Sequence, residues 1–177
     1  MPAACIAAIW AAASTAAAGQ RTATAEDDIK AAFLFNFTQF VEWPPSGENG
    51  RFRICTVAEP GFDAAVDRTV AGESVGSRHI VRSTPASPDD ARDCQILFVG
   101  RQEGDRTEQW VSAVKGLPVL VVGESAAASQ RGAHINFVLE NNRVKFDVNN
   151  TAASRSGLVI SSKLLRVARH VSTTEQP

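Results

Sequence analysis

A β-hairpin centred on Asn141-Asn142 is the sequence feature that most constrains how this chain of 177 residues can fold. Apolar and polar residues alternate on both sides of the asparagine pair, and this period-2 alternation is typical of half-buried strands. Asparagine tolerates the positive φ that both positions of a type I′ turn require, so the pair suits a two-residue loop. The alternating apolar residues are Ile135, Phe137, Leu139, Val144, Phe146 and Val148.

The two-residue loop also fixes the register of the predicted hairpin. The opposing pairs are Glu140–Arg143, Leu139–Val144, Phe137–Phe146 and Ile135–Val148. This register places all six apolar residues on one face, whereas a slip of one residue would scatter them. The other face carries Asn136, Lys145 and Asp147, with His134 opposite Asn149 as an exposed pair. We expect this polar face to be solvated or to contact a partner.

The segment after the hairpin predicts two short helices. Asn149-Asn150-Thr151 can start a helix over residues 152–156, and Gly157 suits the position that follows its end. A short apolar run occupies residues 158–160, after which Ser161 or Ser162 can cap a last helix. The predicted buried stripe of that helix is Leu164, Leu165, Val167 and Ala168.

Predicted helices and strands alternate between residues 26 and 131. Continuous apolar runs at 95–100 and 119–123 are typical of strands in a covered parallel sheet. Residues 52–57 and 78–82 add two more strands, the second of them at an edge. Helices are expected at 26–43, 61–70, 107–115 and 125–130. This alternation predicts an α/β fold: a single-domain sandwich with a mostly parallel central sheet, a C-terminal antiparallel hairpin and helices on both faces.

The helix predicted at residues 26–43 is rich in aromatic residues. Thr24 and Asp27 form a start that resembles a capping box, and Pro44-Pro45 ends the helix. Either the helix is buried on two sides, or part of its aromatic face contacts a second protomer. The residues expected on the apolar face are Ile29, Ala32, Phe33, Asn36, Phe37, Phe40 and Val41.

The first 18 residues are rich in alanine and carry no charged side chain. They fit the apolar region of a secretory signal peptide, and cleavage patterns end at Ala18 and Ala25. We therefore expect residues 1–25 to be a signal peptide, the domain to span 26–171, and 172–177 to be a disordered tail. An ordinary buried Ala-rich helix is the alternative interpretation.

Charge and motifs argue against several classes of function. The net charge is −1, without the basic patch that nucleic-acid binding requires. The glycine patterns of dinucleotide-binding and phosphate-binding loops are absent, and so is the serine elbow of hydrolases. The three histidines, His79, His134 and His170, lie far apart in the sequence. We therefore predict no enzyme activity, no catalytic residue, no cofactor and no metal ion.

Cys55 and Cys94 are the cysteines that remain once the predicted signal peptide, which contains Cys5, is removed. If the chain is exported, the pair suggests one disulfide. Such a bond would close a loop of about 40 residues, worth on the order of 4 kcal/mol in the chain-entropy model. If the chain is not exported, two buried free thiols are the expected state.

Three segments together resemble the YfiR family of periplasmic regulators. The first is KAAFLFNFTQFVEWP at residues 30–44, which resembles the opening helix of that family. The second is CQILFVG at residues 94–100, which is similar to a family strand. The third is the block from Ile135 to Ala168, which resembles the closing family signature. The likeness covers residues 29–170.

This resemblance implies a regulator rather than an enzyme. Its best-known members repress an inner-membrane diguanylate cyclase by binding the periplasmic sensor region of the cyclase, which controls cyclic-di-GMP and biofilm formation. An outer-membrane lipoprotein can sequester such a repressor. The resemblance also implies a homodimer and redox sensitivity. Cys55 and Cys94 match a family disulfide, whereas the second cysteine pair of some members is absent here.

We therefore expect a periplasmic protein that acts through protein–protein contact. The alternative is a periplasmic small-ligand-binding module that feeds a sensor or transporter, with its pocket at the carboxyl-terminal edge of the sheet. A hydrolase with a cryptic site is a third hypothesis, which the scattered histidines disfavour. The candidate partner-contact residues are Phe33, Phe37, Trp43, Asn136, Lys145 and Asp147.

Overall fold

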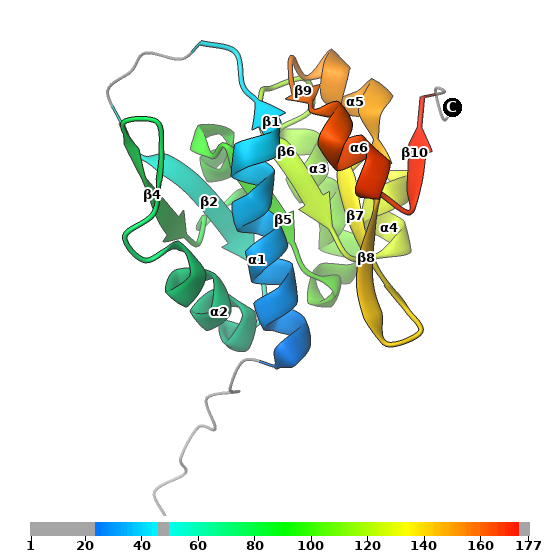
Figure 1. The fold of residues 1–177 in the computed structure, drawn as a ribbon, viewed down its shortest axis with the longest axis horizontal. Coiled ribbons are helices and arrows are strands. Elements are labelled where there is room, and N and C mark those ends of the chain that lie inside the picture. The colour runs from blue at the N-terminus through cyan, green and yellow to red at the C-terminus, as the bar shows by residue number, and fades with distance from the viewer. Residues whose placement is uncertain (1–23, 46–49, 174–177) are drawn as a thin grey trace, which may run out of the picture.

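An eight-stranded sheet forms the centre of the molecule (Figure 1). The structure is a computed structural model that describes residues 24–45 and 50–173. In spatial order, the strands are β10 (His170–Ser172), β8 (Arg143–Asn149), β7 (Ile135–Glu140), β6 (Leu120–Gly123), β5 (Ile96–Val99), β2 (Phe52–Val57), β4 (Arg78–Ser83) and β3 (Ser74–Val75).

The sheet is mostly parallel, as the sequence predicts. β4, β2, β5, β6 and β7 run parallel to one another, and β10 runs parallel to β8. The pairs β7–β8 and β3–β4 are antiparallel. Every residue of β5 and β6 is buried, which explains their continuous apolar sequences, because both faces of a parallel sheet are covered.

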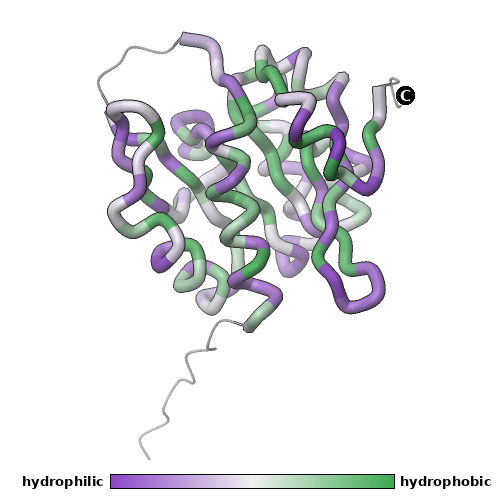
Figure 2. The backbone as a smooth tube through the Cα atoms, in the orientation of Figure 1, coloured by the Kyte–Doolittle hydropathy of each residue, from purple (hydrophilic) through white to green (hydrophobic). Residues whose placement is uncertain are grey.

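Helices cover both faces of the sheet, which completes the predicted sandwich. One core lies under α1 (Ala25–Phe40), α2 (Pro60–Val70), α5 (Asn150–Arg155) and α6 (Ser162–Val167). The other lies under α3 (Thr107–Ala113), α4 (Ala126–Gln130) and the 3₁₀-helix η1 (Pro88–Asp93). A second 3₁₀-helix, η2 (Arg101–Arg106), precedes α3. Figure 2 shows apolar stretches concentrated along the central strands and the helices that cover them.

The predicted hairpin is confirmed in every pair of its register. Asn141 and Asn142 have φ of 51° and 58°, as a type I′ turn requires. Leu139 is nevertheless 50% exposed, because it lies next to the turn, where the hairpin projects beyond the covering helices (Figure 1). The expectation of an exposed His134 is wrong: this side chain is 4% exposed and lies between Val121 and Ser156.

α1 starts at the predicted capping box but ends three residues early. The Thr24 hydroxyl accepts from the Asp27 N–H, and the Asp27 carboxylate accepts from the Thr24 N–H. After Phe40, the chain extends into β1 (Val41–Glu42), which pairs antiparallel with β9 (Val159–Ile160). The β-branched Val41 favours this extended backbone over another helical turn.

The buried face of α1 also differs from the predicted one. Ile29, Ala32 and Asn36 are exposed, which corrects the expected stripe. The apolar residues of this helix are too numerous to define a single stripe. Packing against α2 and the sheet buries a face that is rotated by about 100° around the helix axis from the predicted face. The buried residues are Lys30, Ala31, Leu34, Phe37 and Thr38.

The predicted caps of the two C-terminal helices are present, and the chain after them forms an additional strand of the sheet. Asn149 caps α5, Gly157 has a positive φ after it, and Ser161 caps α6. Val167 is exposed rather than part of a buried stripe, because α6 covers the core through Leu164. The strand β10 was not predicted, since three residues offer too little alternation to be recognised. Strand β3, which lies outside β4, also corrects the expected edge position of residues 78–82.

The predicted signal peptide falls almost wholly outside the described residues, as do residues 174–177 of the predicted tail. Both stay predictions, together with the domain boundary. Within the described part of the chain, none of the helices has the length and hydropathy that a membrane span needs.

Candidate functional site

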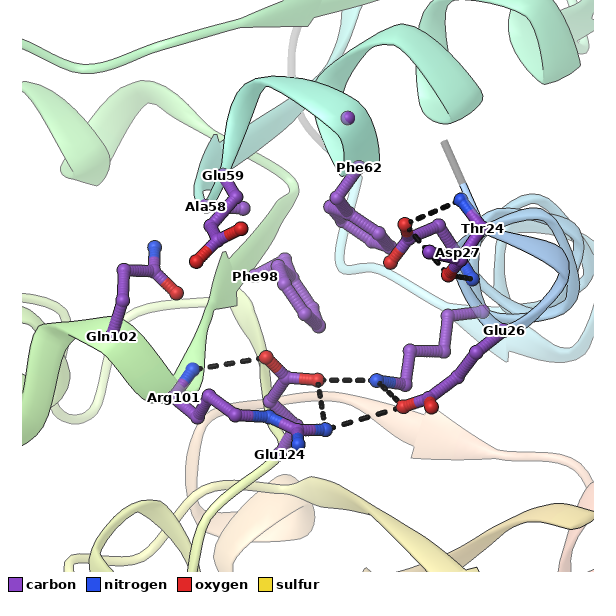
Figure 3. A pocket seen from close by; sticks show the side chains of 12 residues that line it. Thr24, Glu26, Asp27, Ala58, Glu59, Phe62, Phe98, Arg101, Gln102 and Glu124 are labelled. Carbon is purple, nitrogen blue, oxygen red and sulfur yellow. Dashed lines mark hydrogen bonds and ion pairs between the residues drawn. The ribbon is translucent and has the colours of Figure 1, made fainter. Parts of the chain in front are cut away.

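A hollow of about 290 Å³ opens at the carboxyl-terminal ends of β2, β5 and β6 (Figure 3). The first turns of α1 and α2 and the start of η2 close its sides. This end of a parallel sheet is where ligands and functional side chains commonly gather, because the loops that leave the strands can vary without disturbing the core. The side chains drawn around it are Thr24, Glu26, Asp27, Lys30, Ala58, Glu59, Gly61, Phe62, Phe98, Arg101, Gln102 and Glu124.

An ion-pair network crosses the floor of this hollow. Lys30 is only 5% exposed, and its Nζ lies 2.5 Å from Glu124 Oε2 and in contact with the Glu26 carboxylate. Arg101 donates its backbone N–H to Glu124 Oε1 at 2.9 Å, and its guanidinium contacts both carboxylates. The Glu124 carboxylate therefore raises the pKa of Arg101. A buried ammonium needs this compensation, since removal of one partner would leave an unpaired charge.

Two stacked aromatic rings form the apolar wall beside the network. Phe62 of α2 and Phe98 of β5 have ring centroids 4.2 Å apart. Both rings are almost completely buried, so they attach α2 to the sheet rather than present a free face. The floor of the hollow thus consists of charged residues that neutralise one another, and its apolar wall is part of the hydrophobic core.

The polar face of the hairpin continues from this network. A shallow trough shares Glu26, Lys30, Arg101 and Glu124 with the hollow and extends over the hairpin. We call Asn136, Lys145 and Asp147, which stand on the same side of the hairpin, the hairpin polar face. The trough also reaches Leu139, the exposed apolar residue near the turn.

Ion pairs order the charged members of this face. Arg169 holds Asp147 with two hydrogen bonds, of 2.8 Å and 2.5 Å, so the pair is bidentate. Lys145 contacts the Glu140 carboxylate, which also lies 3.5 Å from Arg169. These two cations lower the pKa of Glu140, and Lys145 has the larger effect. The charged side chains of this face are therefore paired with one another in the structure.

Asn136 differs from its neighbours on the hairpin polar face. Its Oδ1 is buried and accepts no hydrogen bond from the described residues. The amide nitrogen makes a long contact of 3.4 Å with the Phe137 carbonyl. Buried polar atoms are nearly always paired, so this one marks a place where the fold leaves hydrogen-bonding capacity unused.

The aromatic candidates Phe33, Phe37 and Trp43 pack in or beside the core. Phe37 is fully buried and packs on Phe137 and Phe146, which corrects its candidacy as an exposed contact. Phe33 is half-buried against the same rings. Trp43 donates its indole N–H to the Gln95 carbonyl at 3.0 Å. The structure therefore brings Asn136, Lys145 and Asp147 together and leaves the aromatic candidates in the core or at its margin.

Cys55 and Cys94 form a disulfide, as expected for the exported state. Cys55 lies in β2, and Cys94 precedes β5, the strand paired with β2. Their Cα atoms are 5.9 Å apart and both side chains are buried. The bond therefore joins two neighbouring strands beneath the face that carries α3.

Lys30, Arg101 and Glu124 were missed as site residues by sequence reasoning. Their positions carry the signal: Arg101 follows Gly100, just after β5, and Glu124 follows Gly123, the last residue of β6. Polar residues at such strand ends share one edge of the sheet. Lys30 is four residues after Glu26 and reads as an ordinary exposed helix pair, although the structure buries it. Within the described residues, no cluster of three or more candidate ligands could hold a metal ion.

Gly123 connects the strand end to α4 and allows a direct mutational test. A Cβ at this position would lie 2.3 Å from the Ala128 Cβ and 3.1 Å from Asn136 Oδ1. We expect Gly123→Ala to lower the free energy of unfolding by about 1–3 kcal/mol, measured by urea denaturation. Gly100→Ala is the matched control, because there the new Cβ meets only the flexible Gln102 side chain. Equal losses in the two variants would contradict the expected clash.

A family model described as YfiR/HmsC-like matches residues 27–169. Among solved structures, the chain is similar to a conserved domain protein from Vibrio cholerae O1 biovar eltor. The identity is 12%, the match covers 85% of this chain and 61% of that one, and the TM-score is 0.58. It is also similar to an ABC domain from Streptococcus pneumoniae solved in complex with L-Trp. That identity is 11%, with 69% and 55% coverage and a TM-score of 0.51. At these identities the two structures support the fold alone, and this chain spans about three fifths of their lengths.

Proposed function

Because the chain belongs to the YfiR/HmsC-like family, we propose that it is an exported periplasmic regulator rather than an enzyme. In this proposal it binds the periplasmic sensor region of an inner-membrane diguanylate cyclase and represses it, which limits cyclic-di-GMP synthesis and biofilm formation. The observation that carries the proposal is the family match, which spans nearly all of the described domain. A homodimeric state and sequestration by an outer-membrane lipoprotein belong to the same proposal.

The hairpin polar face is our proposed contact surface for the cyclase. Asp147 is already held by Arg169, and Lys145 by Glu140, so these side chains lose little conformational freedom when a partner binds. Val138, which is partly exposed and pairs with Lys145 on the same face, supplies an apolar side chain among the charges. A surface of this kind fits a partner with complementary charges around a small apolar patch.

Repression requires that the regulator distinguish two states of the cyclase. A bound protein shifts a conformational equilibrium only by the difference between its affinities for the two conformations. The regulator would therefore bind the inactive arrangement of the sensor region more tightly. A hundredfold difference in affinity corresponds to about 2.7 kcal/mol, which a few ordered polar contacts can supply.

The hollow at the carboxyl-terminal edge agrees in position with the small-ligand alternative but supports it weakly. Lys30 and Arg101 are its cations, and both are paired with Glu26 and Glu124. A ligand would have to replace these ion pairs. The network therefore fits a structural role at this edge better than a role in ligand capture.

Capture of the partner tests the proposed function. The tagged, exported protein is crosslinked mildly to membranes, recovered and analysed by mass spectrometry. We expect to recover a membrane protein with a cytoplasmic diguanylate cyclase domain, and deletion of the regulator should raise cyclic-di-GMP. If no such protein is recovered and the nucleotide level does not change, the cyclase proposal is wrong.

Charge reversal on the hairpin tests the proposed surface. We expect Lys145→Glu to reduce crosslinking to the cyclase about tenfold, because it replaces a favourable charge contact with a repulsive one. Lys163→Glu on exposed α6 is the matched control and should leave crosslinking unchanged. Thermal unfolding of both variants checks that the fold is intact. Equal capture by the two variants would move the interface away from the hairpin.

A further inference from the structure

A second cavity lies at the opposite end of the sheet, beside the amino-terminal ends of β6 and β7. Its volume is about 360 Å³, within the range of small-molecule sites. The carboxyl-terminal ends of α3 and α4 and one side of α5 surround it, together with the chain just before β7. Neither the predicted contact residues nor the ion-pair network of the hollow contributes to it.

The charged residues around this cavity all carry the same sign. Lys115, Arg131 and Arg155 line it, whereas no aspartate or glutamate does. Arg131 pairs with Glu108, a largely exposed residue outside the lining, at 3.2 Å. Basic residues are common at the ends of helices, where they compensate the carbonyl dipoles. The basic residues alone therefore do not indicate an anion-binding site. They do so only together with the polar groups on the floor of the cavity.

That floor contains a buried histidine–serine pair. His134 Nδ1 accepts the Val121 N–H at 3.0 Å, and Nε2 lies 3.2 Å from the Ser156 hydroxyl oxygen. The side chains are 4% and 6% exposed. Burial lowers the pKa of His134 to about 4, against an opposing backbone interaction with Val119, so the ring is neutral at pH 7.

The hydrogen bonds assign the tautomer of His134 and the role of Ser156. Since Nδ1 accepts a hydrogen bond from the Val121 N–H, we place the single ring proton on Nε2. Nε2–H therefore donates to the Ser156 oxygen, which leaves the hydroxyl proton out of this bond. Among the described residues, the structure gives this hydroxyl no acceptor. Ser156 is thus a buried donor that lines a cavity with a basic rim.

We propose that this cavity binds a small organic anion. The carboxylate or phosphate oxygens would accept from the Ser156 hydroxyl and from the neighbouring Arg155 as charge-assisted hydrogen bonds, with Lys115 and Arg131 adding positive charge at the rim. The apolar part of the ligand would pack on Val111 and Val114, which form the wall contributed by α3. This site does not depend on the proposed repression of a cyclase, since it uses a different face of the molecule.

A titration followed by NMR amide shifts tests the proposal. The probes are phenylacetate, phenyl phosphate and the neutral phenylacetamide, each added to the oxidised protein up to about 10 mM, which detects millimolar affinity. We expect at least one anion to shift the amides around Ser156, Gly132 and Lys115, and the neutral amide to leave them unchanged. The two anions distinguish a carboxylate site from a phosphate site.

Two substitutions and one matched control locate the binding. Arg155→Gln should weaken the binding of the anion about tenfold, because it removes one charge-assisted hydrogen bond. Arg166→Gln should not, although Arg166 also lies in the last turn of a short helix. Ser156→Ala should weaken binding through loss of its donor, with thermal unfolding as the check on folding. The proposal is overturned if neither anion shifts these amides, if phenylacetamide binds equally well, or if Arg166→Gln has the same effect as Arg155→Gln.

Discussion

Removal of the Cys55–Cys94 disulfide by the double substitution Cys55→Ala/Cys94→Ala is expected to lower the free energy of unfolding by about 4 kcal/mol. The bond closes a loop with a sequence separation of 39, so it restricts the unfolded chain strongly. In the folded state, Cys55 lies within β2 and Cys94 lies just before its partner strand β5, so alanine at both positions leaves the strand pairing intact. Such a loss is a large fraction of the stability of a typical domain.

Urea denaturation of the oxidised protein, the reduced protein and the double variant measures this effect. Reductant should shift the midpoint of the natural protein to lower urea and leave the double variant unchanged. The slope of unfolding should also increase without the disulfide, because the unfolded chain then exposes more surface. Export of the variant should fall as well. If reductant leaves the midpoint of the natural protein unchanged, the disulfide does not stabilise the fold.

The elements that the sequence predicts best are those whose signals are local. The hairpin register follows from six alternating apolar residues and two asparagines, and each of its pairs is present. The caps at Thr24, Asn149 and Ser161 are equally local. In contrast, β1 depends on pairing with β9, more than a hundred residues later, and β10 depends on β8. A strand of two or three residues is stable only through its neighbour, so its own sequence cannot reveal it.

The candidate site was harder to predict for the same reason. The hairpin polar face could be read from alternation, since its members lie within a few residues of the turn. The ion pair between Lys30 and Glu124 joins positions 94 residues apart, and only the folded sheet brings them together. The hairpin pattern alone predicts an exposed His134, but residues outside the hairpin bury it. The helices α3 and α5, which enclose it, are set by packing rather than by the hairpin pattern.

The buried His134 predicts a specific loss of stability in acid. Its pKa is about 4 in the folded protein, against a usual value of 6.5, because burial disfavours the imidazolium ion. Between these pH values, the unfolded chain binds a proton that the folded protein does not. Stability must therefore rise with pH in this window, and the contribution present above pH 6.5 is lost as the pH falls to about 4. The difference between the two pKa values is worth about 3 kcal/mol.

Comparison with His134→Asn isolates this contribution from the carboxylates that titrate in the same range. Asparagine keeps an acceptor for the Val121 N–H but does not titrate, so the variant starts from a lower stability and loses less on acidification. The free energy of unfolding, measured between pH 7 and pH 4, should fall by about 3 kcal/mol more in the natural protein. Below pH 4 the two curves should run parallel, because His134 is then protonated in both the folded and the unfolded protein. Parallel curves across the whole range would instead mean that His134 keeps an ordinary pKa and that its ring is accessible to water.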